Sequence, residues 1–116
     1  MKTIIAGSRG FTNPDLIEQA VAESGFHITE VVSGHADGID KLAEAWARKQ
    51  PNMLLRLFPA AWSSLGKRAG YVRNLAMANY AEAAILIWDG KSKGTKMMCN
   101  LAQQHGLKTF LKVINK

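Results

Sequence analysis

The sequence predicts an α/β protein in which a doubly wound, Rossmann-like parallel sheet of about five strands carries helices on both faces. Three observations lead to this fold class. Short apolar runs rich in β-branched residues recur along the 116 residues, segments with helical periodicity lie between them, and glycine-containing loops follow several of the runs. A chain of this length most simply forms one domain, which we expect to span residues 1–116.

The alternation of the two patterns can be followed along the whole chain. The first helix is expected to start at Asn13-Pro14, where asparagine is a favourable N-cap and proline a favourable first residue, and to stop at Gly25. The strands are expected at Thr3–Ala6, Glu30–Ser33, Met53–Phe58, Ala83–Trp88 and Lys108–Ile114. The helices are expected at about 13–25, 39–47, 68–80 and 94–106.

This order of elements places the loops that follow the strands at one edge of the sheet, because crossovers between parallel strands are right-handed. We expect the strand order 3-2-1-4-5, in which the direction of winding reverses between the first and the fourth strand. Ligands of such sheets bind at this reversal. The loops Gly7–Gly10 and Asp89–Thr95 would line it.

The charge of the chain is uneven. The net charge is +6, and residues 1–66 carry six Lys/Arg against seven Asp/Glu, whereas residues 67–116 carry nine against two. This asymmetry suggests an anionic partner, and a solvated basic face without function is the alternative. The single Cys99 agrees with a reducing compartment, and no apolar run resembles a secretory signal or a membrane span, so we expect a cytoplasmic protein.

The loop after the first strand has residues that suit an anion. Gly7 allows close approach of the backbone, Ser8 can donate a hydroxyl hydrogen bond, and Arg9 offers a planar fork for phosphate or carboxylate. The alternative is a structural turn with a surface arginine. The loop lacks the G-x-G-x-x-G pattern, which gives little support to ordinary NAD binding.

The loop after the second strand leads into a helix N-terminus. Gly34 and Gly38 keep the backbone bare where free N–H groups and the helix dipole attract anions. Asp37 is expected to cap the helix and Asp40 to favour its dipole. The alternative is that an aspartate binds a ribose hydroxyl or an Mg²⁺ ion held by ligand phosphates, and no other cofactor is indicated. His35 is a candidate base or stacking group, although a lone loop histidine is more often neither.

The loop after the fourth strand places hydroxyls at the start of another helix. Ser92, Gly94 and Thr95 would bring hydroxyl and backbone N–H groups to an anion, and a capped helix with surface lysines is the alternative. The P-loop pattern G-x-x-x-x-G-K-[ST] is absent, which disfavours triphosphate hydrolysis by that route.

The segment Trp62–Met77 combines glycines with basic residues in a way that packing alone does not explain. We expect Arg73 and Asn74, a turn into a helix, to contact a ligand or to brace the loops around it. Trp62, Val72 and Met77 have a simpler interpretation as core residues.

These loops contain four motifs in a fixed order that covers nearly the whole chain. The motifs are Gly7-Ser8-Arg9 with Phe11; Ser33-Gly34 with Ala36, Gly38 and Asp40; Trp62 followed by Gly66-Lys67, Ala69-Gly70, Arg73-Asn74 and Met77; and Trp88-Asp89-Gly90 with Ser92, Gly94 and Thr95.

Through these motifs the chain resembles the YspA-like branch of the SLOG superfamily, which also includes the LOG phosphoribohydrolases and the DNA-processing protein DprA. The resemblance implies a pocket for a nucleotide or nucleotide-derived ligand, such as an ADP-ribose-like molecule. LOG enzymes carry a catalytic glutamate just after their glycine-threonine pair. Here Lys96, Met97 and Met98 follow Thr95, so that residue is not matched.

We therefore expect a module that binds a phosphate-bearing nucleotide derivative as a sensor or sequestering protein. The first alternative is a hydrolase that cleaves an N-glycosidic or phosphate bond of such a ligand with Asp37, Asp40 or Asp89. The second is single-stranded nucleic-acid binding by the basic half. Pairing into a homo-oligomer would suit so small a chain. The predicted ligand-binding residues are Gly7, Ser8, Arg9, Gly34, His35, Asp37, Gly38, Arg73, Asn74, Asp89, Ser92, Gly94 and Thr95.

Overall fold

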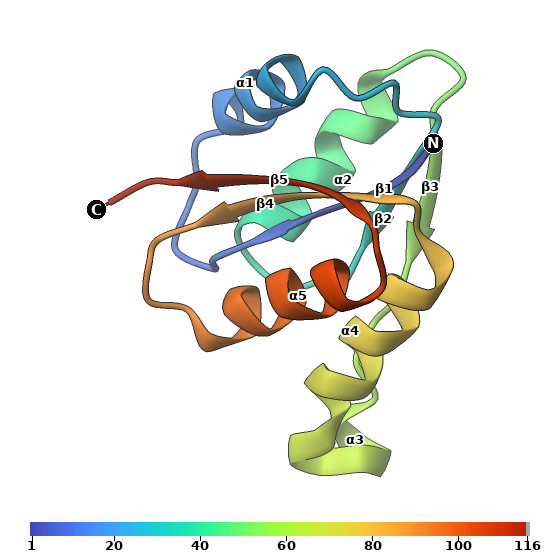
Figure 1. The fold of residues 1–116 in the computed structure, drawn as a ribbon, viewed down its shortest axis with the longest axis vertical. Coiled ribbons are helices and arrows are strands. Elements are labelled where there is room, and N and C mark those ends of the chain that lie inside the picture. Colours follow the sequence, from blue (N-terminus) through green and yellow to red (C-terminus); the bar gives the residue numbers. More distant parts are fainter. Residues whose placement is uncertain (116) are drawn as a thin grey trace.

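The computed structural model describes residues 1–115 and contains one five-stranded sheet between two layers of helices (Figure 1). The strand order is β3-β2-β1-β4-β5, and every neighbouring pair is parallel. The predicted fold class and strand order are therefore confirmed. The strands are β1 (Lys2–Gly7), β2 (Glu30–Ser33), β3 (Leu54–Leu57), β4 (Ala83–Trp88) and β5 (Lys108–Val113).

The helices cover the sheet in two pairs. The pair α1 and α2 packs on one face of the sheet, and the pair α4 and α5 packs on the other (Figure 1). The short helix α3 and the 3₁₀ turn η1 extend the N-terminal end of α4 away from the sheet, and the sequence did not predict this extension. The helices are α1 (Asp15–Ser24), α2 (Ile39–Lys49), α3 (Trp62–Leu65), η1 (Gly66–Arg68), α4 (Ala69–Tyr80) and α5 (Lys93–Gln104).

The central strands β1 and β4 are buried on both faces, as the continuous apolar runs of the sequence predict. Successive side chains of a strand point to opposite faces, so Ile4 and Leu86 pack under α4 and α5 while Ile5 and Ile87 pack under α1 and α2. This double burial fixes the register of the two strands whose ends carry the candidate site.

Helix α1 has the stop that its sequence predicts but starts one residue later, at Asp15, with Pro14 rather than Asn13 as its N-cap residue. The side-chain oxygen of Asn13 still accepts a hydrogen bond from the N–H of Asp15 at 3.0 Å. Gly25 ends the helix in the left-handed conformation with φ of 68°. Both ends are therefore set by local chemistry.

Two glycines let the loops at the carboxyl edge of the sheet pack against each other. A Cβ atom on Gly7 would lie 2.1 Å from the carbonyl oxygen of Ile87, which also accepts the N–H of Ser8 at 3.0 Å. Gly38 has φ of 80°, and a Cβ there would lie 2.5 Å from the carbonyl oxygen of Ser8. These glycines thus bring the ends of β1 and β4 and the start of α2 together.

Within residues 1–115 the structure contains no helix that is both long enough and apolar enough to cross a membrane.

Candidate functional site

Two adjoining cavities lie at the carboxyl edge of the sheet. The first has a volume of about 320 Å³ and is bordered by the ends of β1, α4 and α5. The second has a volume of about 330 Å³ and lies beside the loop that follows β2. Four residues line both cavities and so form their common wall: Arg9, Ala36, Trp62 and Arg73.

The predicted site residues are divided between these cavities. Three of them line neither cavity: Ser8, Gly38 and Asp89. The first cavity is lined by Gly7, Arg9, Arg73, Asn74, Ser92, Gly94 and Thr95. The second is lined by Arg9, Gly34, His35, Asp37 and Arg73.

Ser8 and Asp89 shape the loop after β4 from behind the cavity wall. Ser8 is buried, and its hydroxyl oxygen accepts the N–H of Asp89 at 3.0 Å. The carboxylate of Asp89 accepts the N–H groups of Lys91 and Ser92, each at 2.8 Å. These two hydrogen bonds lower the pKa of Asp89 and hold the loop in the turn that leads into α5.

The N-terminal end of α5 forms part of the first cavity. The hydroxyl oxygen of Ser92 caps the helix by accepting the N–H of Thr95 at 3.3 Å, and it also accepts the hydroxyl of Thr95 at 3.1 Å. The predicted helix start is therefore confirmed. A Cβ atom on Gly94 would meet no atom within 4 Å, so the backbone of this first turn is open to a ligand.

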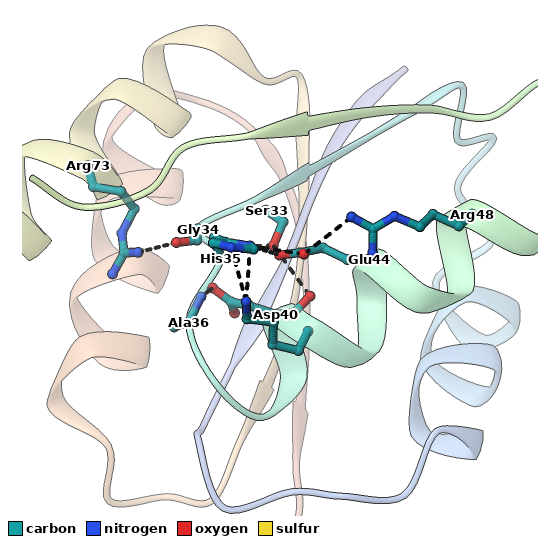
Figure 2. A network of polar contacts seen from close by, with 9 residues as sticks. Ser33, Gly34, His35, Ala36, Asp40, Glu44, Arg48 and Arg73 are labelled. Atoms are coloured by element: carbon teal, nitrogen blue, oxygen red, sulfur yellow. Dashed lines mark hydrogen bonds and ion pairs between the residues drawn. The ribbon is translucent and has the colours of Figure 1, made fainter.

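Arg73 braces the loop after β2 and also faces both cavities. It projects from α4 and donates from Nη1 to the carbonyl oxygen of Gly34 at 2.6 Å, as Figure 2 shows, and from Nε to the side-chain oxygen of Asn74 at 2.7 Å. A Cβ atom on Gly34 would lie 2.7 Å from Nη1, so glycine leaves the room for this contact. A guanidinium has five N–H donors, and further donors therefore remain for a ligand.

Asp40 is a buried carboxyl group in the wall of the first cavity. Its side chain accepts the N–H of Ala36 at 3.3 Å and lies near the charge of Arg73. Burial outweighs both effects and raises the pKa of Asp40 from 3.8 to about 6. Among residues 1–115, Asp40 is the one acidic residue that lines this cavity.

Asp37 does not cap α2, and that prediction is wrong. The N-cap is Gly38, which has no side chain to cap this end of the helix. Asp37 is exposed and lines the second cavity. The prediction failed because Asp40, inside the helix, bonds the backbone of the preceding loop instead.

Glu44 forms a buried network that the sequence analysis missed (Figure 2). Glu44 is 1% exposed, and its carboxylate accepts the hydroxyl of Ser33 at 2.8 Å and lies 3.0 Å from Nδ1 of His35. Arg48 approaches the same carboxylate at 3.9 Å. Asp40, Glu44 and Arg48 follow one another at intervals of four residues on one face of α2, and this polar stripe was the available signal.

The network explains the backbone of His35, which has φ of 61°. This conformation is uncommon for a residue other than glycine. Here the N–H of His35 donates to the hydroxyl oxygen of Ser33 at 3.2 Å while its ring contacts Glu44, and both interactions hold the strained turn beside the second cavity.

The interpretation of Trp62 and Val72 as core residues is wrong, whereas Met77 is in the core. Met77 is 1% exposed, but the exposed fractions are 52% for Trp62 and 43% for Val72. Trp62 begins α3, which extends from the sheet, and so it reaches the cavities rather than the interior.

The charge in the first cavity is mainly positive. Arg9, Lys67 and Arg73 line it, against the single carboxyl group of Asp40. Within the part of the chain that the structure describes, no group of three or more His, Cys, Asp or Glu side chains could hold a metal ion. The arrangement therefore suits an anion that is bound by guanidinium groups, hydroxyls and backbone N–H groups.

The fold and the position of the cavities define a Rossmann-like α/β protein with its candidate site at a topological switch point. Residues 1–64 match the model of the family described as YspA, cpYpsA-related SLOG family. The chain is also similar to the Gene 61 protein of Mycobacterium phage D29, with 30% identity over 115 residues and coverage of 91% of each chain. No solved structure matches it. The chain belongs to the YspA, cpYpsA-related SLOG family, and the resemblance seen in its motifs is confirmed.

The raised pKa of Asp40 predicts a pH-dependent contribution to stability. Below pH 3.8 the carboxyl is protonated in both the folded and the unfolded chain. As the pH rises from 3.8 to about 6, it ionises in the unfolded chain but stays protonated in the folded chain, so the folded state loses stability over this range. A shift of about two pKa units corresponds to about 3 kcal/mol. In Asp40→Asn, the free energy of unfolding relative to the wild type should therefore increase by up to about 3 kcal/mol between about pH 4 and about pH 7.

Urea unfolding of the two proteins across this pH range measures the difference. Asp37→Asn is the matched control, because Asp37 is an exposed aspartate in the loop just before α2 and should show a much smaller change. A difference between Asp40→Asn and the wild type that does not vary with pH would contradict the prediction.

Proposed function

We propose that this protein binds a phosphate-bearing nucleotide or nucleotide-derived ligand, such as an ADP-ribose-like molecule, at the carboxyl edge of its sheet, and that it serves as a sensor or sequestering module. The observation that carries the proposal is the common wall of the two cavities, in which Arg9 and Arg73 face both spaces. A phosphate between them would contact guanidinium groups from two separate elements.

The surroundings of this wall suit a phosphate group. Ser92, Gly94 and Thr95 add the N-terminal end of α5, where backbone N–H groups and the helix dipole attract negative charge. An arginine can donate to two oxygens of one phosphate at once, and such charge-assisted hydrogen bonds are about twice as strong as neutral ones.

The size of the site favours a ligand larger than inorganic phosphate. The cavities have volumes of about 320 and 330 Å³ and share a wall, which is the size range of pockets for nucleotide-sized molecules. Membership of the SLOG family is consistent with a nucleotide-related ligand.

Removal of the Arg9 guanidinium tests the proposal. Arg9→Ala should weaken the binding of ADP-ribose, measured by calorimetry, by about tenfold to a hundredfold, because a hydrogen bond to a charged group contributes about 1.5–3 kcal/mol. Arg68→Ala is the matched control, since Arg68 is an exposed arginine that lines neither cavity and should change the affinity little. If ADP-ribose does not bind, or if both variants weaken it equally, the proposed site is wrong.

One observation favours hydrolysis as a second candidate function. Of the three aspartates considered for a hydrolase, Asp40 combines a place in the first cavity with a pKa raised to about 6, whereas Asp37 lines the second cavity and Asp89 neither. A carboxyl group with a pKa of about 6 is partly protonated near neutral pH. The protonated form can protonate the leaving base of an N-glycosidic bond while water attacks the sugar carbon, and the water then returns a proton to the carboxylate.

Chromatography of free base after incubation with AMP or ADP-ribose tests this candidate. An enzyme of this kind should release base, and Asp40→Asn should reduce the rate by about a hundredfold or more, because general acid catalysis contributes about 10²–10⁴-fold. Asp15→Asn, on α1 and away from both cavities, serves as the control. If the ligand stays intact after prolonged incubation, hydrolysis is contradicted and the binding proposal is unaffected.

A further inference from the structure

We propose that the indole of Trp62 is the platform on which the base of the ligand stacks, so that the site selects nucleotides over sugar phosphates. This inference rests on the proposed phosphate site and adds the group that recognises the rest of the ligand. It rests on the position of Trp62 between the two cavities, on the residues around its ring and on its absence from the apolar clusters of the described core.

Trp62 has no evident part in the apolar core. Its exposed fraction is 52%, and among the described residues neither of the two apolar clusters of the core includes it. A tryptophan that stays in contact with water leaves a large apolar surface without a partner, and burial of such a surface is a main source of affinity for planar ligands.

The position of Trp62 places its ring at the wall that the two cavities share. It is the first residue of α3, and the ring packs beside α4, where its Cη2 atom lies 3.4 Å from the place that a Cβ of Gly70 would occupy. Gly70 has no left-handed backbone that would require glycine. The absence of a side chain there lets the ring lie close to the backbone of α4, and Gly70 itself lines the first cavity.

The residues that line the first cavity are of two chemical kinds. The apolar kind has the aromatic rings of Trp62 and Tyr71 and the thioethers of Met97 and Met98, which make favourable contacts with flat π systems. The polar kind has the arginines and hydroxyls that would bind phosphate. A ligand that satisfies both kinds carries a planar base and a phosphate, which is the chemistry of a nucleotide.

Calorimetry with AMP and ribose 5-phosphate measures base recognition separately from phosphate recognition, because these probes share the sugar phosphate and differ in the base. Trp62→Ala should weaken AMP by about tenfold or more and change ribose 5-phosphate by less than about twofold, given the usual contribution of base stacking. Trp62→Phe should keep most of the AMP affinity, since it retains an aromatic face, and it also serves if the alanine variant does not fold. Val72→Ala is the matched control, because Val72 is an exposed apolar residue of the same region that lines neither cavity.

The outcomes distinguish this inference from the proposed function. If the wild type binds both probes and Trp62→Ala weakens neither, or weakens both equally, the stacking role is overturned while the phosphate site stands. If the wild type binds ADP-ribose but neither AMP nor ribose 5-phosphate, the stacking role is overturned and the phosphate site stands. If it binds none of the three, the proposed function fails and the stacking role fails with it. Selective loss of AMP binding in Trp62→Ala, with Trp62→Phe and Val72→Ala close to the wild type, supports the inference.

Discussion

The hydrogen bond from Arg73 to the carbonyl oxygen of Gly34 connects the two sides of the candidate site. Arg73 comes from α4, which packs on one face of the sheet, and Gly34 begins the loop that leads to α2 on the other face. The contact is possible because residue 34 has no side chain in the space that the guanidinium occupies. Arg73 lines both cavities, so the position of its side chain determines the shape of the wall between them.

The wall of the first cavity also contains two ionisable groups that lose water when the chain folds. Arg73 is partly buried beside Asp40, and burial lowers the pKa of the arginine while it raises that of the aspartate. Each group therefore loses water on burial, and the electrostatic attraction between the two offsets this loss only in part. Buried groups with such shifts concentrate at functional sites, and these two groups lie where the winding of the sheet reverses. The exposed ring of Trp62 next to them supplies an apolar surface at the same place.

Much of the fold could be predicted because its determinants are local. The apolar runs of β1 and β4 and the stop at Gly25 act through neighbours in the chain. The crossover rule then places the loops at one edge of the sheet, and the doubly wound fold class gives the expected strand order. The site was less accessible to sequence reasoning. Glu44 is buried against Ser33 and His35, from which it is separated in the chain by a loop and the first turn of α2. Trp62 is exposed because it belongs to a short helix whose sequence has no clear periodic pattern. Sequence motifs identified which loops meet but could not show whether Ser8 or Asp89 faces the cavity or supports it from behind.

The central claim is that the loops after β1, β2 and β4 form one binding site for a phosphate-bearing ligand at the carboxyl edge of the sheet. An NMR titration of the ¹⁵N-labelled protein with ADP-ribose tests it directly, because each backbone amide reports on its own surroundings. The amides of Arg9, Gly34, Gly94 and Thr95 should shift together and saturate at one ligand concentration, while those of the outer strands β3 and β5 stay nearly unchanged. Shifts confined to the outer strands, or no saturable shifts, would contradict the claim.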